Sequence, residues 1–259
     1  MKKLIVTADD YGYTKAINDG IIRAVTEGIV TDIALMVLTD PEDLEHGLKL
    51  LKDHNLNEVG LHTSLFHWGK TERPGRGDFI KFFKEASDNE IEERALSEIA
   101  EFERLVGAKP KFISPQFNMH GNLRLLKIMA KYVVANNIPM RIPRALIEIE
   151  EITDSNYSAE IYLKRLGVKM TNHLYAHILG ADTEAIKQSF LHELGSVQDD
   201  ESVEIILHPG YNDQITLESS SLNYERARDL SLALDPIFSK NIQDLGYTFS
   251  HMSSLWSQK

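Results

Sequence analysis

Acidic and imidazole side chains end three of the apolar segments that the sequence predicts to be strands. Asp9 and Asp10 end the first of these segments, and His62 and His208 end two others. Two adjacent carboxylates on an apolar strand repel each other unless a cation or a proton shares the site. Imidazole groups bind metal ions and move protons. The pattern therefore indicates metal-assisted hydrolysis, with Asp9 and Asp10 as the carboxylate half of the site.

A fourth segment, residues 114–120, follows another predicted strand and carries Gln116, Asn118 and His120. Each of these polar residues also has an ordinary structural interpretation. An Asp after a strand often caps a helix, and a His before Gly or Pro can simply open a turn. Such groups recur at the same end of successive strands, however, and this recurrence favours a functional site.

The elements that must position these side chains alternate between short apolar runs and segments of helical periodicity. Strand-like runs cover residues 4–6, 33–38, 58–62, 111–114, 140–142, 203–208 and 247–249. Helical periodicity covers residues 15–27, 41–54, 89–105, 123–136, 158–166, 183–194, 224–234 and 236–244. This alternation predicts an α/β fold with a parallel sheet or barrel, in which the carboxyl ends of the strands converge on one face.

Length and composition predict one soluble domain over residues 1–259. The 259 residues are 42% hydrophobic, and no linker rich in Pro, Gly or Ser divides them. The first apolar run is too short for a signal peptide, and no run reaches the roughly 18 apolar residues that span a bilayer. We therefore expect a cytoplasmic protein.

Charge and motif content exclude several classes of function. The net charge of −11 repels phosphate backbones and anionic lipids, so we expect neither nucleic acid nor a membrane as a partner. The absence of cysteine excludes thiolate chemistry and Cys-based metal sites. No Gly-x-Ser-x-Gly motif is present, which argues against a serine hydrolase. His173 and His177 have the i,i+4 spacing of a helical zinc pair but lack the HExxH pattern, and we interpret them as packing residues.

Several motifs, in order along nearly the whole chain, resemble the YdjC-like carbohydrate deacetylases, which include chitooligosaccharide deacetylase. They are Ile5-Val6-Thr7-Ala8-Asp9-Asp10-Tyr11-Gly12, Gly28-Ile29-Val30-Thr31, Gly60-Leu61-His62, Met119-His120-Gly121 and Leu207-His208-Pro209-Gly210-Tyr211, followed by Tyr224, Arg226 and Asp229-Leu230. The resemblance implies a single-domain, distorted, TIM-barrel-like (βα) fold with mostly parallel strands. It also implies removal of an N-acetyl group from an amino sugar or chito-oligosaccharide, and it is consistent with a homodimer.

The resemblance further implies a divalent ion held by one Asp and two His residues. By motif position, Asp10 and His62 are two of these ligands. Asp9 matches the aspartate whose carboxylate serves as the general base, and His208 matches the histidine that protonates the leaving amine. The other matching or neighbouring polar residues are assigned to the substrate or to support of the site: Asn118, His120, Arg141, Tyr211 and Arg226.

The third metal ligand departs from the family pattern. The family usually has Asp-Ser-His-x-His/Asn-x-His after this strand, which places Gln116 where the ligand histidine is expected and Ser114 where the Asp is expected. A glutamine offers a neutral oxygen, which suits Mg²⁺ or Ca²⁺ better than Zn²⁺. We therefore expect Mg²⁺, with Zn²⁺ or Ca²⁺ as alternatives; a weakly held or lost metal, or His120 as a substitute ligand, stays open.

Three hypotheses follow for the function. The first is metal-dependent amide hydrolysis at an N-acetyl group, in which Arg141 or Arg226 orients Asp9, His208 or a substrate anion. The second is a catalytically weakened or metal-free sugar-binding or regulatory homologue, which the departures at Gln116 and Ser114 favour. The third is a glycoside or phospho-sugar hydrolase, which needs two acids across a sugar from each other, a geometry that adjacent residues cannot supply alone.

Overall fold

The computed structural model describes residues 1–71, 73–144, 156–178, 180 and 182–256. At its centre is a sheet with the strand order β3-β2-β1-β5-β4, and β6 pairs with the start of β1. The strands are β1 (Lys2–Tyr11), β2 (Asp32–Leu35), β3 (Val59–Leu61), β4 (His173–Tyr175), β5 (Ser202–Leu207) and β6 (Tyr247–Phe249). Every pairing between these strands is parallel.

Contacts beyond the named strands curl this sheet into a distorted barrel. Isolated parallel bridges join Leu61 to Ile113 and Ile113 to Met140. The Met140 N–H then donates to the carbonyl of Lys169, just ahead of β4, at 3.1 Å. Neighbours therefore run from β4 through β5, β1, β2 and β3 and back toward β4. The predicted α/β fold of mostly parallel strands is confirmed, although two of the expected strands are reduced to these single bridges.

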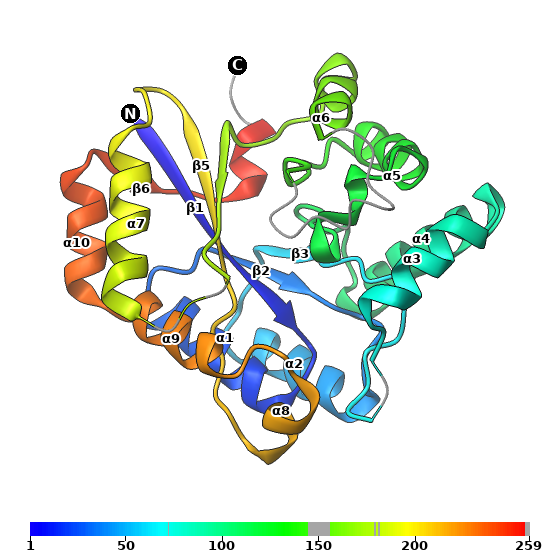
Figure 1. Cartoon of the computed structure of the whole chain (residues 1–259), viewed down its shortest axis with the longest axis horizontal. Helices are drawn as coiled ribbons and strands as arrows, with labels where there is room; N and C mark the ends of the chain where they lie inside the picture. The colour runs from blue at the N-terminus through cyan, green and yellow to red at the C-terminus, as the bar shows by residue number, and fades with distance from the viewer. Residues whose placement is uncertain (72, 145–155, 179, 181, 257–259) are drawn as a thin grey trace.

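Helices surround the sheet, as Figure 1 shows, with α7 and α10 on one side of the central β1–β5 pair and α3 and α4 on the other. The helices are α1 (Lys15–Thr26), α2 (Pro41–Asp53), α3 (Arg76–Glu85), α4 (Asp88–Val106), α5 (Leu123–Asn136), α6 (Asn156–Arg165), α7 (Thr183–Gly195), α8 (Gln214–Ser219), α9 (Tyr224–Ala233) and α10 (Pro236–Asp244), with 3-10 turns η1 (Gln116–Gly121) and η2 (Met252–Trp256). Each helix predicted from periodicity is present, with ends that differ by at most two residues. Helices α3 and α8 were not predicted.

Two segments differ from the sequence-based interpretation for local reasons. The sequence shows no helical periodicity in residues 68–78, but α3 begins within them because the Asp78 carboxylate accepts the Gly75 N–H at 2.8 Å and closes the first turn. His173 lies on strand β4, so it shares no helix face with His177. Their Nε2 atoms pair with different glutamates, at 2.9 and 3.0 Å.

The amino ends of the strands are closed by the C-terminal segment. Met252 and Leu255 of η2 pack against Ile5 of β1, Ala34 of β2 and the Phe112 ring. The Met252 N–H also donates to a carboxylate oxygen at the start of β2, at 3.1 Å. In barrels of this kind the amino-terminal face serves stability and the opposite face carries the chemistry.

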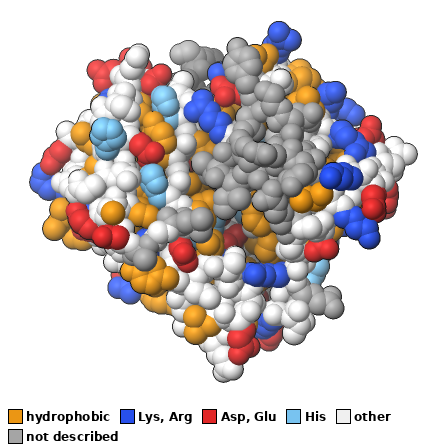
Figure 2. Space-filling model, in the orientation of Figure 1, with side chains coloured by type: hydrophobic (Ala, Val, Ile, Leu, Met, Phe, Trp, Pro, Cys, Tyr) orange, Lys and Arg blue, Asp and Glu red, His pale blue; other side chains and the backbone are white. Residues whose placement is uncertain are grey.

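The surface carries charges of both signs. On the face drawn in Figure 2, acidic and basic side chains are spread around the periphery. Within the described residues, no helix combines the length and the apolar character needed to cross a bilayer.

Candidate active site

A pocket opens at the carboxyl ends of β1 and β5 and gathers most of the predicted site residues. Its wall includes Asp9, Asp10, Gln116, Asn118, Arg141, His208 and Arg226. These residues come from segments that are far apart in the sequence, and the parallel strands bring them together. His62, from the end of β3, is buried directly behind Asp10.

An irregularity at the end of β1 turns both adjacent carboxylates into this pocket. Successive side chains on a regular strand point to opposite faces. Asp10 has φ +68°, and the register with β2 shifts between Ala8 and Tyr11, so the alternation is broken there. Gly12 follows with φ +97°, and a Cβ at this position would lie 2.5 Å from the Met36 carbonyl oxygen. Glycine is therefore required to complete the turn.

Asp10, His62 and Gln116 present three ligand atoms to one another. The His62 ring places Nδ1 2.6 Å from the Ser114 carbonyl oxygen, so Nδ1–H donates there. Its Nε2 then faces the Gln116 Oε1, in close contact, and the Asp10 Oδ1 at 3.6 Å. With Nδ1 protonated, a neutral ring keeps the Nε2 lone pair for a metal ion.

The Asp10 carboxylate is held as an anion by Arg226. Burial would raise the pKa of Asp10, but the Arg226 guanidinium, with His208 and His62 nearby, lowers it to about 2. Arg226 donates from Nη2 to Oδ2 at 2.8 Å and from Nε to Ser220 Oγ at 3.1 Å. The other oxygen, Oδ1, is buried without a hydrogen-bond partner and faces His62. Arg226 thus fixes one oxygen and leaves the other as a ligand.

Asp9 is held by a second arginine in the barrel interior. Arg141 donates from Nη1 to Oδ2 at 2.7 Å and from Nη2 to Oδ1 at 2.9 Å. Burial opposes ionisation of Asp9, yet the charge of Arg141 and smaller contributions from His62 and His208 lower its pKa. Asp9 is therefore ionised at neutral pH, which is the state that can accept a proton.

The donor set at the pocket fits a divalent ion. A buried anionic oxygen of Asp10, an imidazole nitrogen of His62 and an amide oxygen of Gln116 converge, and electron-rich atoms in such contact are stabilised by a cation. Carboxylate and amide oxygens favour hard ions such as Mg²⁺, and the imidazole also accommodates Zn²⁺. The residues present therefore fit the metal that the sequence pattern predicted.

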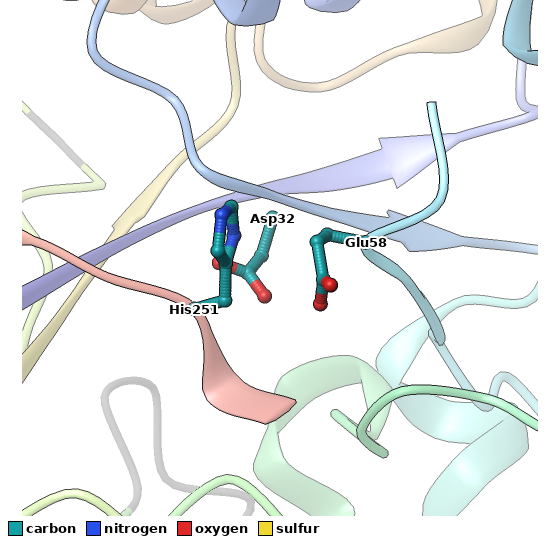
Figure 3. Close-up of side chains that lie close together, drawn as sticks. All are labelled: Asp32, Glu58 and His251. Carbon is teal, nitrogen blue, oxygen red and sulfur yellow. The ribbon is translucent and has the colours of Figure 1, made fainter. Parts of the chain in front are cut away.

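A second group with metal-ligand chemistry lies at the opposite end of the strands. Asp32, Glu58 and His251 point toward one another in Figure 3, at the starts of β2 and β3 and after β6. His251 Nδ1 lies 3.4 Å from the Asp32 Oδ2 and donates to the Thr31 carbonyl at 3.1 Å. This ion pair fastens the C-terminal segment and is separate from the pocket.

His208 follows β5 and lines the pocket, and its backbone N–H donates to the Asp229 Oδ2 at 2.8 Å. Arg228 donates to the other Asp229 oxygen from Nε and Nη2, at 2.9 and 2.7 Å. Burial raises the pKa of Asp229 in spite of Arg228 and His208. Asp229 therefore anchors the turn that presents His208, a role that the sequence did not reveal.

An aromatic wall completes the pocket. Tyr13 and Trp68 meet edge to face, with ring centroids 6.0 Å apart, and Phe117 lies 6.0 Å from Trp68. Arg73 lines the same side and donates to the Ser219 carbonyl at 2.8 Å. Tyr13 and Phe117 are not among the site residues predicted from the sequence.

Besides His62, two predicted residues lie outside the pocket wall. Tyr211 is 40% exposed and its hydroxyl accepts a hydrogen bond from Arg23 on α1, so the structure does not bring it to the site. His120 is fully buried, its Nε2 donates to the Arg141 carbonyl at 2.9 Å, and burial lowers its pKa to about 3. His120 therefore supports the backbone of Arg141 from behind.

Known proteins match the chain over most of its length. A family described as YdjC-like protein matches residues 3–244. A carbohydrate deacetylase of Brevibacillus brevis is 30% identical over 239 residues, 89% of this chain and 90% of the relative. A chitooligosaccharide deacetylase of Yersinia pestis is 26% identical over 95% of this chain and 96% of its own.

Solved structures share the fold. A putative cellobiose-phosphate cleavage protein of Enterococcus faecalis superposes with a TM-score of 0.75 at 21% identity, over 98% of each chain. A lactam utilization protein of Thermus thermophilus has a TM-score of 0.55 at 13% identity, over 97% of this chain and 100% of that one. At 21% and 13% identity, the similarity to these two structures shows a shared fold.

Proposed function

The chain belongs to the YdjC-like family, and on this premise we propose that it is a metal-dependent hydrolase that removes N-acetyl groups from amino sugars or chito-oligosaccharides. The observation that carries the proposal is the convergence of Asp10 Oδ1, His62 Nε2 and Gln116 Oε1 beside an ionised Asp9. The names of relatives that span most of this chain support the same reaction.

In this proposal Asp10, His62 and Gln116 hold a divalent ion, with Mg²⁺ expected. Such an ion supplies a Lewis acid that polarises the amide carbonyl and makes water a better nucleophile at neutral pH. Arg226 contributes by keeping Asp10 ionised and its Oδ1 free.

The protein's own groups supply the proton transfers. Asp9 removes a proton from the water that attacks the acetyl carbonyl carbon, and Arg141 keeps Asp9 oriented for this step. The C–N bond then breaks, and His208 donates a proton to the departing amine. Acetate and a free amino sugar are the products. Positioned acid–base groups of this kind contribute typically about 10²–10⁴-fold to the rate.

The aromatic wall suits a sugar substrate. Tyr13, Trp68 and Phe117 give the pocket wall apolar area that suits the C–H face of a pyranose ring. Arg73 offers donors to the sugar hydroxyls, and the Asn118 Oδ1, which is unpaired among the described residues, offers an acceptor. A small amino sugar or a short oligosaccharide is therefore the proposed substrate class. A cytoplasmic location, a homodimer and one domain over residues 1–259 stay predictions.

Gln116 favours one alternative function, a sugar-binding homologue with weakened catalysis. Replacing an imidazole ligand by a neutral amide oxygen weakens the hold on transition metals. Ionised Asp9 and Asp10 with their dedicated arginines argue against it, because buried charges are costly to keep where they have no use.

Product identification tests the proposal. Wild type is incubated with N,N′-diacetylchitobiose and Mg²⁺, and acetate, free amine and reducing sugar are measured together. We expect acetate and amine in equal amounts, with no increase in reducing ends. New reducing ends without acetate would indicate a glycoside hydrolase instead. Binding of the sugar without any product, with Mg²⁺, Zn²⁺ or Ca²⁺, would favour the weakened homologue.

A further inference from the structure

Glu204 is a buried acid in the middle of β5 that the proposed mechanism has not used. Its side chain is fully inaccessible to solvent, and its neighbours Val203, Ile205 and Ile206 are apolar. Burial raises its pKa although Arg141 opposes the shift. A carboxyl group in such surroundings is unfavourable unless it makes specific bonds.

The bonds of Glu204 converge on Arg141. One oxygen, Oε1, accepts from Arg141 Nε at 2.9 Å and from Nη2 at 2.7 Å. The same oxygen accepts from the Thr7 hydroxyl at 2.8 Å, which ties it to β1. The guanidinium therefore lies between two carboxylates, with Glu204 on one side and Asp9 on the other.

The geometry of a guanidinium makes this arrangement directional. Nε and both Nη atoms lie in one plane, so two bonds to Glu204 fix the rotation of the group about its Cδ–Nε bond. The Nη1 and Nη2 donors are then aligned with the two oxygens of Asp9. His120 holds the Arg141 backbone in addition, through its carbonyl.

We propose that Glu204 is a positioning residue that orients Arg141 and, through it, the Asp9 base. Glu204 does not line the pocket and touches no reacting group, so it acts through the guanidinium. The proposal rests on the proposed function and adds a residue to the machinery of the same site. A displacement of about 1 Å in a reacting group can lower a rate by about 100-fold.

Two substitutions at Glu204, both of similar volume, distinguish a role in orienting Arg141 from a role in stabilising the fold. Glu204→Gln keeps a carbonyl oxygen that can accept from Arg141, whereas Glu204→Leu fills the space without an acceptor. For acetate release we expect kcat to fall about 100-fold in the Leu variant with KM within about twofold, because Asp9 acts on the water and not on sugar binding. The Gln variant should recover most of the loss.

Ile205→Ala is the matched control, because this neighbour on β5 is equally buried but packs in the main core, away from Arg141. It should lower the thermal midpoint and leave kcat unchanged below it. Any of three results would overturn the proposal. Glu204→Leu could keep the wild-type kcat, Glu204→Gln could be as inactive as Glu204→Leu, or Ile205→Ala could lower kcat as much as Glu204→Leu does.

Two further measurements keep the test decisive. If the Leu variant does not fold, Arg141→Lys replaces it: the ammonium retains the charge but lacks the planar set of donors that makes four bonds to the two carboxylates, so wild-type kcat there would overturn positioning. If wild type releases no acetate, the proposed function fails, and a crystal structure of Glu204→Leu still tests the placement. We expect the guanidinium to leave Asp9; an unmoved guanidinium would contradict the inference.

Discussion

Replacing Arg226 by methionine should destabilise the protein, because the buried carboxylate of Asp10 loses the positive charge that compensates its burial. The pKa of Asp10 falls from its ordinary 3.8 to about 2 because Arg226 outweighs burial. At 1.36 kcal/mol per pKa unit, this difference contributes about 2 kcal/mol to the free energy of unfolding at pH 7. Without Arg226, burial of Asp10 loses its main opposing charge, and loss of one partner of a buried ion pair typically costs about 3–5 kcal/mol. We expect a loss within that range.

Two further effects, of pH and of added Mg²⁺, show whether the lost stability comes from the buried charge of Asp10. A lowered pKa stabilises the fold above 3.8, and this contribution is lost only as the pH falls through about 2. In Arg226→Met the buried carboxyl of Asp10 takes up a proton more readily. The loss in the free energy of unfolding relative to wild type should therefore be smaller at pH 5 than at pH 7. Added Mg²⁺ should also reduce this loss, because a cation replaces the missing charge beside Asp10.

Urea unfolding of wild type and Arg226→Met, at pH 7 and pH 5 with chelator or Mg²⁺, measures these effects. Arg23→Met, which removes an exposed pair with Glu27, is the control and should change stability little. A loss below about 1 kcal/mol for Arg226→Met, or one that is the same at both pH values, would show that Arg226 does not stabilise the protein through the charge of Asp10.

Three other substitutions test separate parts of the account. Gln116→His should raise Zn²⁺ affinity by about 10–100-fold in calorimetric titration; unchanged affinity would mean that residue 116 is not a ligand. His208→Gln should lower kcat for acetate release by about 10²–10⁴-fold with little change in KM, and a change in KM alone would contradict its role as proton donor. The hydrogen bond with Asp32 raises the pKa of His251, so its stabilisation is present below pH 6.5 and lost as the pH rises through the folded-state value. His251→Asn should therefore lower the thermal midpoint more at pH 6 than at pH 9, and equal effects would exclude this ion pair as the cause.

The sequence could predict the part of the site that follows directly from strand ends. Asp9, Asp10, His62 and His208 each end an apolar run, and parallel strands bring such ends together whatever the details of packing. The structure brings Asp9, Asp10 and His208 to one pocket wall and places His62 behind Asp10. Periodicity also located the helices other than α3 and α8, because their buried faces have the regular spacing that a core requires.

The supporting residues could not be predicted in this way, because they depend on distant contacts. Arg141 reaches across the barrel to Asp9, 132 positions away in the sequence. Tyr211 was placed at the site by motif alone, but the chain after His208 passes against α1, where Gly20 and Gly210 meet, and carries Tyr211 outside. A signal did exist for Glu204, since a single acid within an apolar strand must find a partner.

A titration with Mg²⁺ tests whether acetate release depends on a metal ion held by Asp10. Acetate released from N,N′-diacetylchitobiose is measured as Mg²⁺ is added to metal-free wild type and to Asp10→Asn. We expect release by wild type to rise with Mg²⁺ and to saturate, while Asp10→Asn stays inactive at concentrations that saturate wild type. Equal release in the presence of chelator, or an Asp10→Asn variant with the wild-type response, would contradict this dependence.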